Sequence, residues 1–203
     1  MSKINLKVLH GAISQAVDSR EIREKVRRQA NERFEEAKAS MLENFQNHPV
    51  TTEIEAGAGS ENTSNTLGGY GNLYSFIGFE AGLDPTLQVR EYLEKSTKLN
   101  QRVSFEKKDL GGVFHLQANI PSVEELESIT PSPWDTKSWI RGIERGISGL
   151  GYYLYSKIRF FENSRSNTAI QSDYKLRNLG YKPVKYMSNI INKFKTEIGR
   201  IKI

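Results

Sequence analysis

The residue types that most often carry catalysis or bind metals are few and scattered in this chain of 203 residues. The three histidines, His10, His48 and His115, lack a second histidine at metal-ligand or helical spacing. Cysteine is absent, which excludes disulfides, thiolate nucleophiles and cysteine-ligated zinc or iron–sulfur sites. We therefore expect no metal site and no cofactor.

Glycine and acidic residues also fall short of a recognisable site. The glycines between 57 and 71 match neither a phosphate-binding loop nor a dinucleotide fingerprint. Ser148 lies in a glycine-rich stretch, but Leu150 stands where a nucleophile elbow requires glycine. Carboxylate pairs such as Glu35 and Glu36 lack an apolar setting that would raise a pKa for acid–base work. The sequence predicts a protein that is not an enzyme.

The strongest signal for binding is charge. Residues 1–136 carry 15 Lys and Arg against 20 Asp and Glu, whereas residues 137–203 carry 14 against 4. In that basic last third, cations alternate with aromatic residues from Tyr152 to Tyr186. A single-stranded nucleic-acid groove needs this combination, and protein interfaces are enriched in it. We favour an interface, because no nucleic-acid motif accompanies the pattern, and keep nucleic-acid binding as the alternative.

The first half of the chain predicts an arm, a long helix and a glycine-rich loop. Residues 1–11 alternate as an extended arm, and a helix capped by Asp18, with Glu21 three residues later, runs to Asn47. Its apolar stripe comprises Val17, Ile22, Val26, Ala30, Phe34, Ala37, Met41 and Phe45. We predict a strand at 50–55 and a flexible loop at 57–71.

The middle of the chain follows with shorter elements. The aromatic run at 73–79 is typical of a buried strand or an anchor segment, and Asp84-Pro85 opens a short helix. Residues 103–108 and 112–120 predict a hairpin, and 121–133 a linker with a helical turn at 123–129.

The last third predicts a helix from residue 135, capped by Asp135 or Thr136 and reaching Leu154. Residues 152–161 predict a strand, 163–171 a polar loop and 185–201 a closing helix. The fold class is then α+β in a single domain, with both terminal helices packed on a small, mostly antiparallel sheet. Because neither a signal peptide nor a membrane-spanning run occurs, we expect a soluble cytoplasmic product without a membrane partner.

Two passages resemble a known group of proteins. Residues 47–85 follow the long charged helix and read NHPVTTEIEAGAGSENTSNTLGGYGNLYSFIGFEAGLDP. In this order they resemble neck and tail-completion proteins of tailed phages, where such a helix leads into a T-x-E segment, small residues, a T-L or G-x-L step and a sheet. Residues 160–171, FFENSRSNTAIQ, and 181–198, YKPVKYMSNIINKFKTEI, resemble the polar loop and closing helix of that group. These passages cover less than half of the chain.

The resemblance implies a structural virion protein that forms a ring of identical subunits at the head–tail junction or tail end, with no catalytic residue. It implies other head–tail proteins as partners, such as the connector, tail tube or sheath, and a ring lumen leaves room for nucleic acid. The expected location is the virion, after assembly in the host cytoplasm. A closed ring needs two different, complementary surfaces, which the acidic and basic parts of the chain would supply.

We expect the interfaces to lie on the arm at 1–11, the loop at 57–71 and the basic aromatic lobe. The predicted interface residues are Ile4, Leu6, Val8, Leu67, Tyr70, Tyr74, Phe76, Arg141, Arg145, Arg159, Arg165, Lys182 and Lys185.

Overall fold

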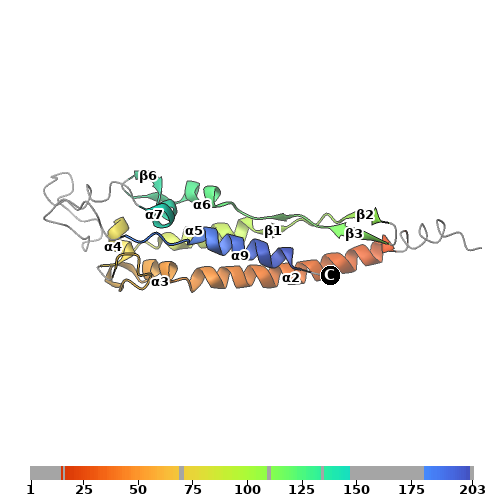
Figure 1. Ribbon diagram of the computed structural model, residues 1–203, viewed down its shortest axis with the longest axis horizontal. Coiled ribbons are helices and arrows are strands. Elements are labelled where there is room, and N and C mark those ends of the chain that lie inside the picture. The colour runs from red at the N-terminus through yellow and green to blue at the C-terminus, as the bar shows by residue number, and fades with distance from the viewer. Residues whose placement is uncertain are drawn as a thin grey trace, which may run out of the picture.

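The longest element is α2, Arg20–Gln46, which runs along one side of an elongated molecule (Figure 1). This computed structural model describes residue 15 and residues 17–68, 71–108, 111–133, 135–146 and 181–201. The Ser19 hydroxyl caps α2 by accepting a hydrogen bond from the Ile22 N–H at 3.4 Å. The prediction that Asp18 caps this helix was wrong. The Asp18 carboxylate instead accepts a hydrogen bond from Arg23 Nε at 2.6 Å.

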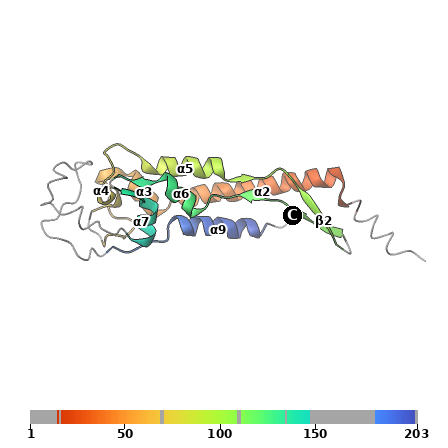
Figure 2. The ribbon, with the colours of Figure 1, turned by 90° about the horizontal axis from the view of Figure 1, so that it is seen from above.

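The apolar stripe of α2 is buried only over its second part. Ala30, Phe34, Ala37, Met41 and Phe45 are in the core, whereas Ile22 stays 36% exposed. The buried part lies against α9, Met187–Gly199, which runs antiparallel to α2 (Figures 1 and 2). The rings of Phe34 and Phe194 meet edge to face with centroids 5.8 Å apart. The predicted closing helix is confirmed, with its start at residue 187.

The chain turns after α2 into a second helix, α3, Pro49–Glu55. We predicted a strand here, which was wrong. Pro49 occupies the first helical turn, where its missing N–H and fixed φ favour a helix start. The His48 Nδ1 accepts a hydrogen bond from the Val50 N–H at 3.2 Å and caps the helix. Proline therefore ends one helix and begins the next.

The capping role of His48 predicts a dependence of stability on pH. Partial burial lowers the pKa of His48 below its ordinary value of 6.5. The unfolded chain then binds a proton more readily than the folded protein, so the free energy of unfolding falls as the pH drops through about 6.5. Protonation of Nδ1 also removes the acceptor for Val50.

We expect His48→Asn, which keeps a capping acceptor, to lose less stability than the wild type between pH 7.5 and 5.5 in urea unfolding. His48→Ala should be less stable by about 0.5–2 kcal/mol at pH 7.5. Equal pH profiles for the wild type and His48→Asn would contradict this role.

The aromatic run after the glycine-rich loop forms a buried helix, α4, Leu73–Ile77, and not a strand. The Asn72 Oδ1 accepts a hydrogen bond from the Ser75 N–H at 2.8 Å and caps its start. Gly78 ends it in the left-handed region at φ 83°, where glycine is favoured. The predicted burial is confirmed, and the error concerns the element type, because a short apolar run fits either type.

Two short helices agree with their predictions. Helix α5, Pro85–Ser96, begins after Asp84, whose Oδ1 accepts a hydrogen bond from the Thr86 N–H at 2.9 Å. Helix α6, Val123–Ile129, has the predicted bounds and a reciprocal capping box between Ser122 and Glu125.

Within the described residues, the strands form three separate two-stranded antiparallel ladders and not one sheet. They are β1 (Lys98–Leu99) with β4 (Ala118–Asn119), β2 (Ser104–Lys108) with β3 (Gly111–His115), and β5 (Pro131–Ser132) with β6 (Asp135–Ser138). The β2–β3 pair confirms the predicted hairpin, with Phe105 opposite Phe114, but its second strand ends at His115 and not at residue 120, because Ala118 and Asn119 pair with β1. A Cβ atom at Gly112 would overlap the Phe105 ring, so glycine is needed there.

Helix α7, Trp139–Arg145, is shorter than the predicted second helix. Residues 135–138 belong to β6, and Ser138 caps α7, so neither Asp135 nor Thr136 is the cap. Gly146, at φ 95°, ends the helix after Arg145.

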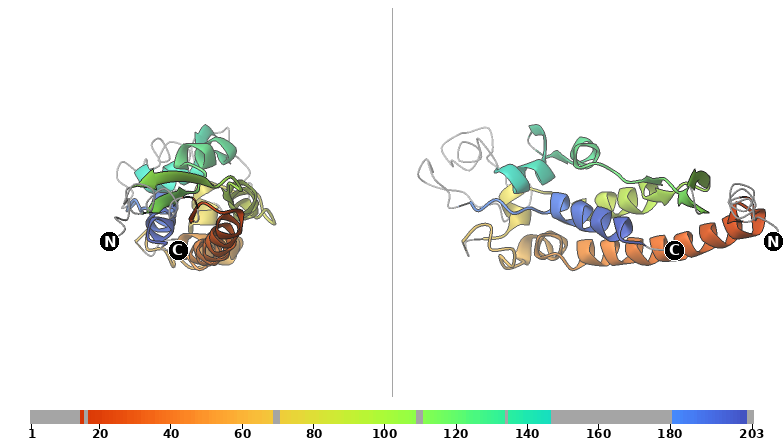
Figure 3. Two further views of the ribbon diagram at one scale, coloured as in Figure 1. Left: turned by 90° about the vertical axis from the view of Figure 1, so that its right-hand side faces the viewer. Right: turned by 45° about the vertical axis from the view of Figure 1, so that its right-hand side comes forward.

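One hydrophobic cluster joins the helices, and the ladders lie beside it (Figures 1 and 3). Tyr186 is fully buried, with its ring centroid 6.1 Å from that of Phe45 and 6.5 Å from that of Trp139. The α+β class with long terminal helices is confirmed, although the helices pack mainly on one another. The predicted arm at 1–11, the strand at 152–161 and the loop at 163–171 lie outside the described residues.

Candidate docking surfaces

Glu53 organises the glycine-rich loop from inside the protein. Its side chain is buried on α3 at 1% exposure. The Oε1 atom accepts hydrogen bonds from Asn62 Nδ2 at 2.8 Å and from the Leu73 N–H at 2.6 Å, and Oε2 accepts one from the Ser64 N–H at 2.8 Å. A single carboxylate therefore joins the middle of the loop to the start of α4, Leu73–Ile77.

Two asparagines complete this network. The Asn62 Oδ1 accepts a hydrogen bond from the Leu67 N–H at 3.1 Å, and Asn72 Nδ2 donates to the carbonyls of Ala58 and Ser60 at 2.8 and 3.0 Å. A short 3₁₀ helix, η1 (Gly57–Gly59), opens the segment. Within residues 57–68 of the predicted flexible loop, this network links the chain to α3 and to the start of α4.

The chain before α9 docks between the loop and α7. The Lys182 N–H donates to the Thr66 carbonyl at 2.8 Å, and the Tyr181 hydroxyl donates to the Ile143 carbonyl at 3.1 Å. The Tyr181 ring stacks on Phe76 with centroids 5.7 Å apart. The Glu144 carboxylate accepts hydrogen bonds from two N–H groups at the start of α9. These contacts join the loop, α7 and the start of α9 at one end of the molecule.

The predicted interface residues fall into three groups. Leu67, Tyr74 and Phe76 are core residues, at 8%, 1% and 3% exposure, so their side chains face this chain and not a partner. Arg141, Arg145, Lys182 and Lys185 are exposed at this end of the molecule. The remaining residues, Ile4, Leu6, Val8, Tyr70, Arg159 and Arg165, lie outside the described part of the chain.

A groove between the start of α5 and the β5–β6 ladder is a candidate docking surface that the sequence reading missed. Its apolar side chains include Leu83 and Leu87, which are 51% and 50% exposed. Its acidic side chains are Glu80, Asp84 and Glu91. The described lining residues include no lysine or arginine, and they are Phe79, Glu80, Leu83, Asp84, Pro85, Leu87, Gln88, Glu91, Thr130, Pro131, Ser132, Pro133 and Trp139.

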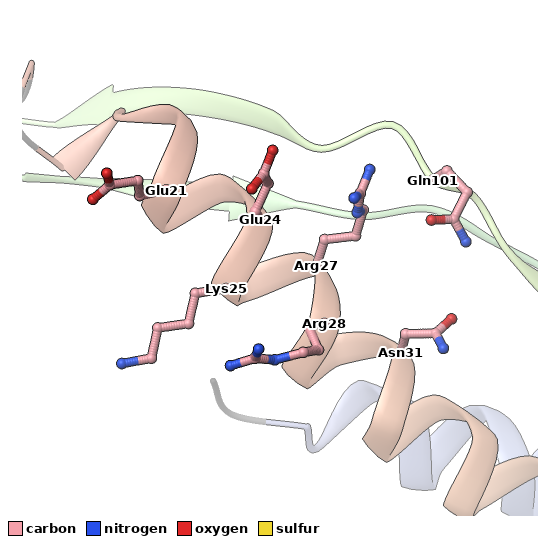
Figure 4. A pocket seen from close by; sticks show the side chains of 7 residues that line it. All are labelled: Glu21, Glu24, Lys25, Arg27, Arg28, Asn31 and Gln101. Atoms are coloured by element: carbon pink, nitrogen blue, oxygen red, sulfur yellow. The ribbon is translucent and has the colours of Figure 1, made fainter.

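The opposite end of the molecule is basic. It is built from the start of α2 and the β2–β3 hairpin, and the Arg23 guanidinium joins the two by donating to the Val103 carbonyl at 3.0 Å (Figure 1). A shallow depression there is lined by α2 and Gln101, and Figure 4 shows Arg27 extending towards Gln101 while Lys25 and Arg28 point to the other side. The exposed cations of this end are Arg20, Lys25, Arg27, Arg28, Arg102, Lys107 and Lys108, and they outnumber the exposed carboxylates of Glu21, Glu24 and Glu106.

Within the described residues, exposed cations also gather at a place that the charge count along the sequence did not indicate. The basic end combines α2 with the hairpin, and both belong to the part of the chain that is acidic in total. The acidic groove lies near α4 and α7, at the other end in both Figures 1 and 2.

The described residues show little that favours chemistry. Within them, no group of three or more His, Asp or Glu side chains is arranged to hold a metal ion. None of the helices in the described part of the chain combines the length and the apolar character that a membrane crossing requires.

Comparisons with known proteins leave the family open. No protein-family model matches the chain, and neither the curated proteins nor the solved structures gave a match.

Proposed function

We propose that this protein is a structural subunit that acts by assembling with copies of itself and with other proteins, as a neck or tail-completion protein of a tailed phage. The observation that supports assembly is that the two ends carry different surfaces: an acidic groove with half-exposed leucines at one, and a cluster of exposed cations, with Glu21 and Glu24 among them, at the other. Unlike surfaces on one subunit permit heterologous contacts, which close into a ring when the rotation between subunits allows it.

The phage assignment has a narrower basis. It rests on the T-x-E segment, the small residues and the T-L step within residues 47–85. In the folded chain these residues make structural contacts. Thr51 Oγ1 lies 2.6 Å from the Tyr186 hydroxyl, and the Glu53 carboxylate accepts a hydrogen bond from the Leu73 N–H. The Thr66 carbonyl accepts a hydrogen bond from the Lys182 N–H. These residues therefore support the fold, which is consistent with the proposal that the protein is not an enzyme.

The proposal is tested by whether the protein is present in purified virions and whether virions assemble without it. We expect the chain among the proteins of purified virions by mass spectrometry, and we expect a stop codon in its gene to leave heads and tails that do not join or tails of abnormal length. Complete, infectious particles from the mutant would contradict the proposal.

Nucleic-acid binding is the second candidate, because the cations at the basic end include Arg27 and Lys107 without a partner in the described chain. The discriminating measurement is oligonucleotide binding across a salt series. Tight binding at physiological salt with a steep salt dependence would favour this second function, because each released counterion adds to the slope.

A further inference from the structure

We propose that the corner between α2 and α3 is an acid-sensitive hinge, in which protonation of His48 raises the population of an open state with α3 and the loop at 57–68 detached. The corner consists of Asn47 and His48, which stand between the end of α2 at Gln46 and the start of α3 at Pro49 (Figure 1). This response is a property of the fold and is independent of the assembly role proposed above.

His48 holds the start of α3 through an atom that a proton would occupy. Its Nδ1 accepts the hydrogen bond from the Val50 N–H at 3.2 Å, and its backbone carbonyl accepts one from the Thr52 N–H at 3.0 Å. A protonated imidazole is a donor at both nitrogens, and a positive charge is unfavourable at the N-terminal end of a helix. Protonation therefore removes one hydrogen bond and adds repulsion at the same place.

The surroundings of the His48 ring also favour its neutral form. The ring centroid lies 4.8 Å from that of Tyr186, which is fully buried. The carboxylates that act on this tyrosine belong to Glu55 on α3, Asp84 before α5 and Glu144 on α7. At His48 burial has the larger effect, because it lowers the pKa below the ordinary value of 6.5. A ring that becomes exposed when α3 opens therefore takes up a proton more readily than the ring in the closed form.

Helix α3 and the loop are joined by hydrogen bonds along the length of the helix. Thr63 Oγ1 donates to the Pro49 carbonyl at 3.2 Å, and Ser60 Oγ donates to the Glu53 carbonyl at 2.9 Å. The Glu53 carboxylate accepts a hydrogen bond from the Ser64 N–H at 2.8 Å. Opening of α3 at the corner is therefore transmitted to residues 60–64.

Other contacts of α3 limit the size of the response. Val50 and Ile54 are fully buried, and Glu55 accepts hydrogen bonds from Gln46 Nε2 at 2.6 Å and from Thr86 Oγ1 at 3.0 Å. The closed form therefore stays dominant, and acid changes the open population only by the factor that protonation supplies. For a ring that titrates at 6.5 in the open state, that factor is at most about tenfold at pH 5.5.

Amide hydrogen exchange followed by NMR at pH 7.5 and 5.5 tests the hinge, with rates normalised for the intrinsic effect of pH on exchange. We expect the protection of the Thr52 and Ser64 amides to fall together, by several-fold and at most about tenfold. The amide of Thr97, at the end of α5, should keep its protection. The chemical shift of the Val50 amide should titrate with the same midpoint as the His48 ring, below 6.5.

Two variants assign the response to one histidine. His48→Asn keeps a capping acceptor without a titrating ring and should abolish the response. His115→Asn removes an exposed ring from β3 and should leave the response as in the wild type. Glu53 and Glu55 remain in both variants, so a response that persists in His48→Asn would belong to another group and overturn the hinge. An equal loss of protection at Thr97 would also overturn it, because acid would then act on the whole fold.

Discussion

Glu53→Ala should lower the free energy of unfolding by about 3–5 kcal/mol, since three donors would lose a charged acceptor inside the protein. These donors are Asn62 Nδ2 and the N–H groups of Ser64 and Leu73, and they belong to the loop and to the start of α4. The substitution therefore removes the carboxylate that joins α3 to the segment that follows it, while the hydrogen bonds from Ser60 and Thr63 to backbone carbonyls of α3 remain. Urea unfolding followed by circular dichroism measures the change.

Two variants make this prediction specific. Glu53→Gln keeps the volume but turns one acceptor into a donor, so we expect an intermediate loss of about 1–2 kcal/mol. Glu61→Ala removes an exposed carboxylate from the same loop and should change stability by less than about 0.5 kcal/mol. If Glu53→Ala were as stable as Glu61→Ala, the loop would not depend on the buried carboxylate.

Tyr186→Ala should cost about 3–5 kcal/mol, the range for removing a large buried aromatic side chain. Tyr186 is 0% exposed and lies where α2, α3, α7 and α9 meet. Its ring contacts those of Phe45, His48 and Trp139, and its hydroxyl lies 2.6 Å from Thr51 Oγ1. We expect thermal unfolding to show a large decrease in Tm for this variant.

Tyr186→Phe separates packing from the hydrogen bond. It keeps the ring and leaves the Thr51 hydroxyl unpaired, so we expect a loss of about 1–2 kcal/mol. Burial raises the pKa of Tyr186, so the folded protein keeps the hydroxyl neutral while the unfolded chain ionises at its ordinary value. The wild type should therefore lose stability as the pH rises above about 10, and Tyr186→Phe should lose less. Identical profiles would argue against burial of this hydroxyl.

The sequence predicts elements best where one residue decides the local conformation. Asp84-Pro85 predicts the start of α5, and the glycine-flanked β runs predict the β2–β3 hairpin. The apolar spacing predicts the buried part of α2, although burial also depends on where α9 ends. Ile22 lies beyond the reach of α9 and stays exposed.

The errors arise where tertiary contacts decide the outcome. Residues 50–55 alternate like a strand, yet Pro49 and His48 start a helix whose buried face includes Val50 and Ile54. The loop at 57–68 has a composition that allows many paths, and its path depends on hydrogen bonds to side chains outside the loop, above all the buried carboxylate of Glu53 and the amide of Asn72. Glu53 stands among polar residues in the sequence, so nothing there indicated that its carboxylate would be buried and would bind the loop.

The docking groove could not be predicted for a related reason. Its walls come from α5 and from β5, which are about 45 residues apart along the chain, and its acidic character appears only when they meet. The basic end likewise combines α2 with the hairpin. Counting charges along the chain gave a different asymmetry, with its basic part in residues 137–203.

The mass distribution of the purified full-length chain tests the central claim most directly. If the protein works by assembly through its two unlike ends, mass photometry over a concentration series should show discrete species built from several 23.1 kDa chains, and electron microscopy should show them as rings or short filaments. A single 23.1 kDa species at every concentration, unchanged when other virion proteins are added, would contradict it.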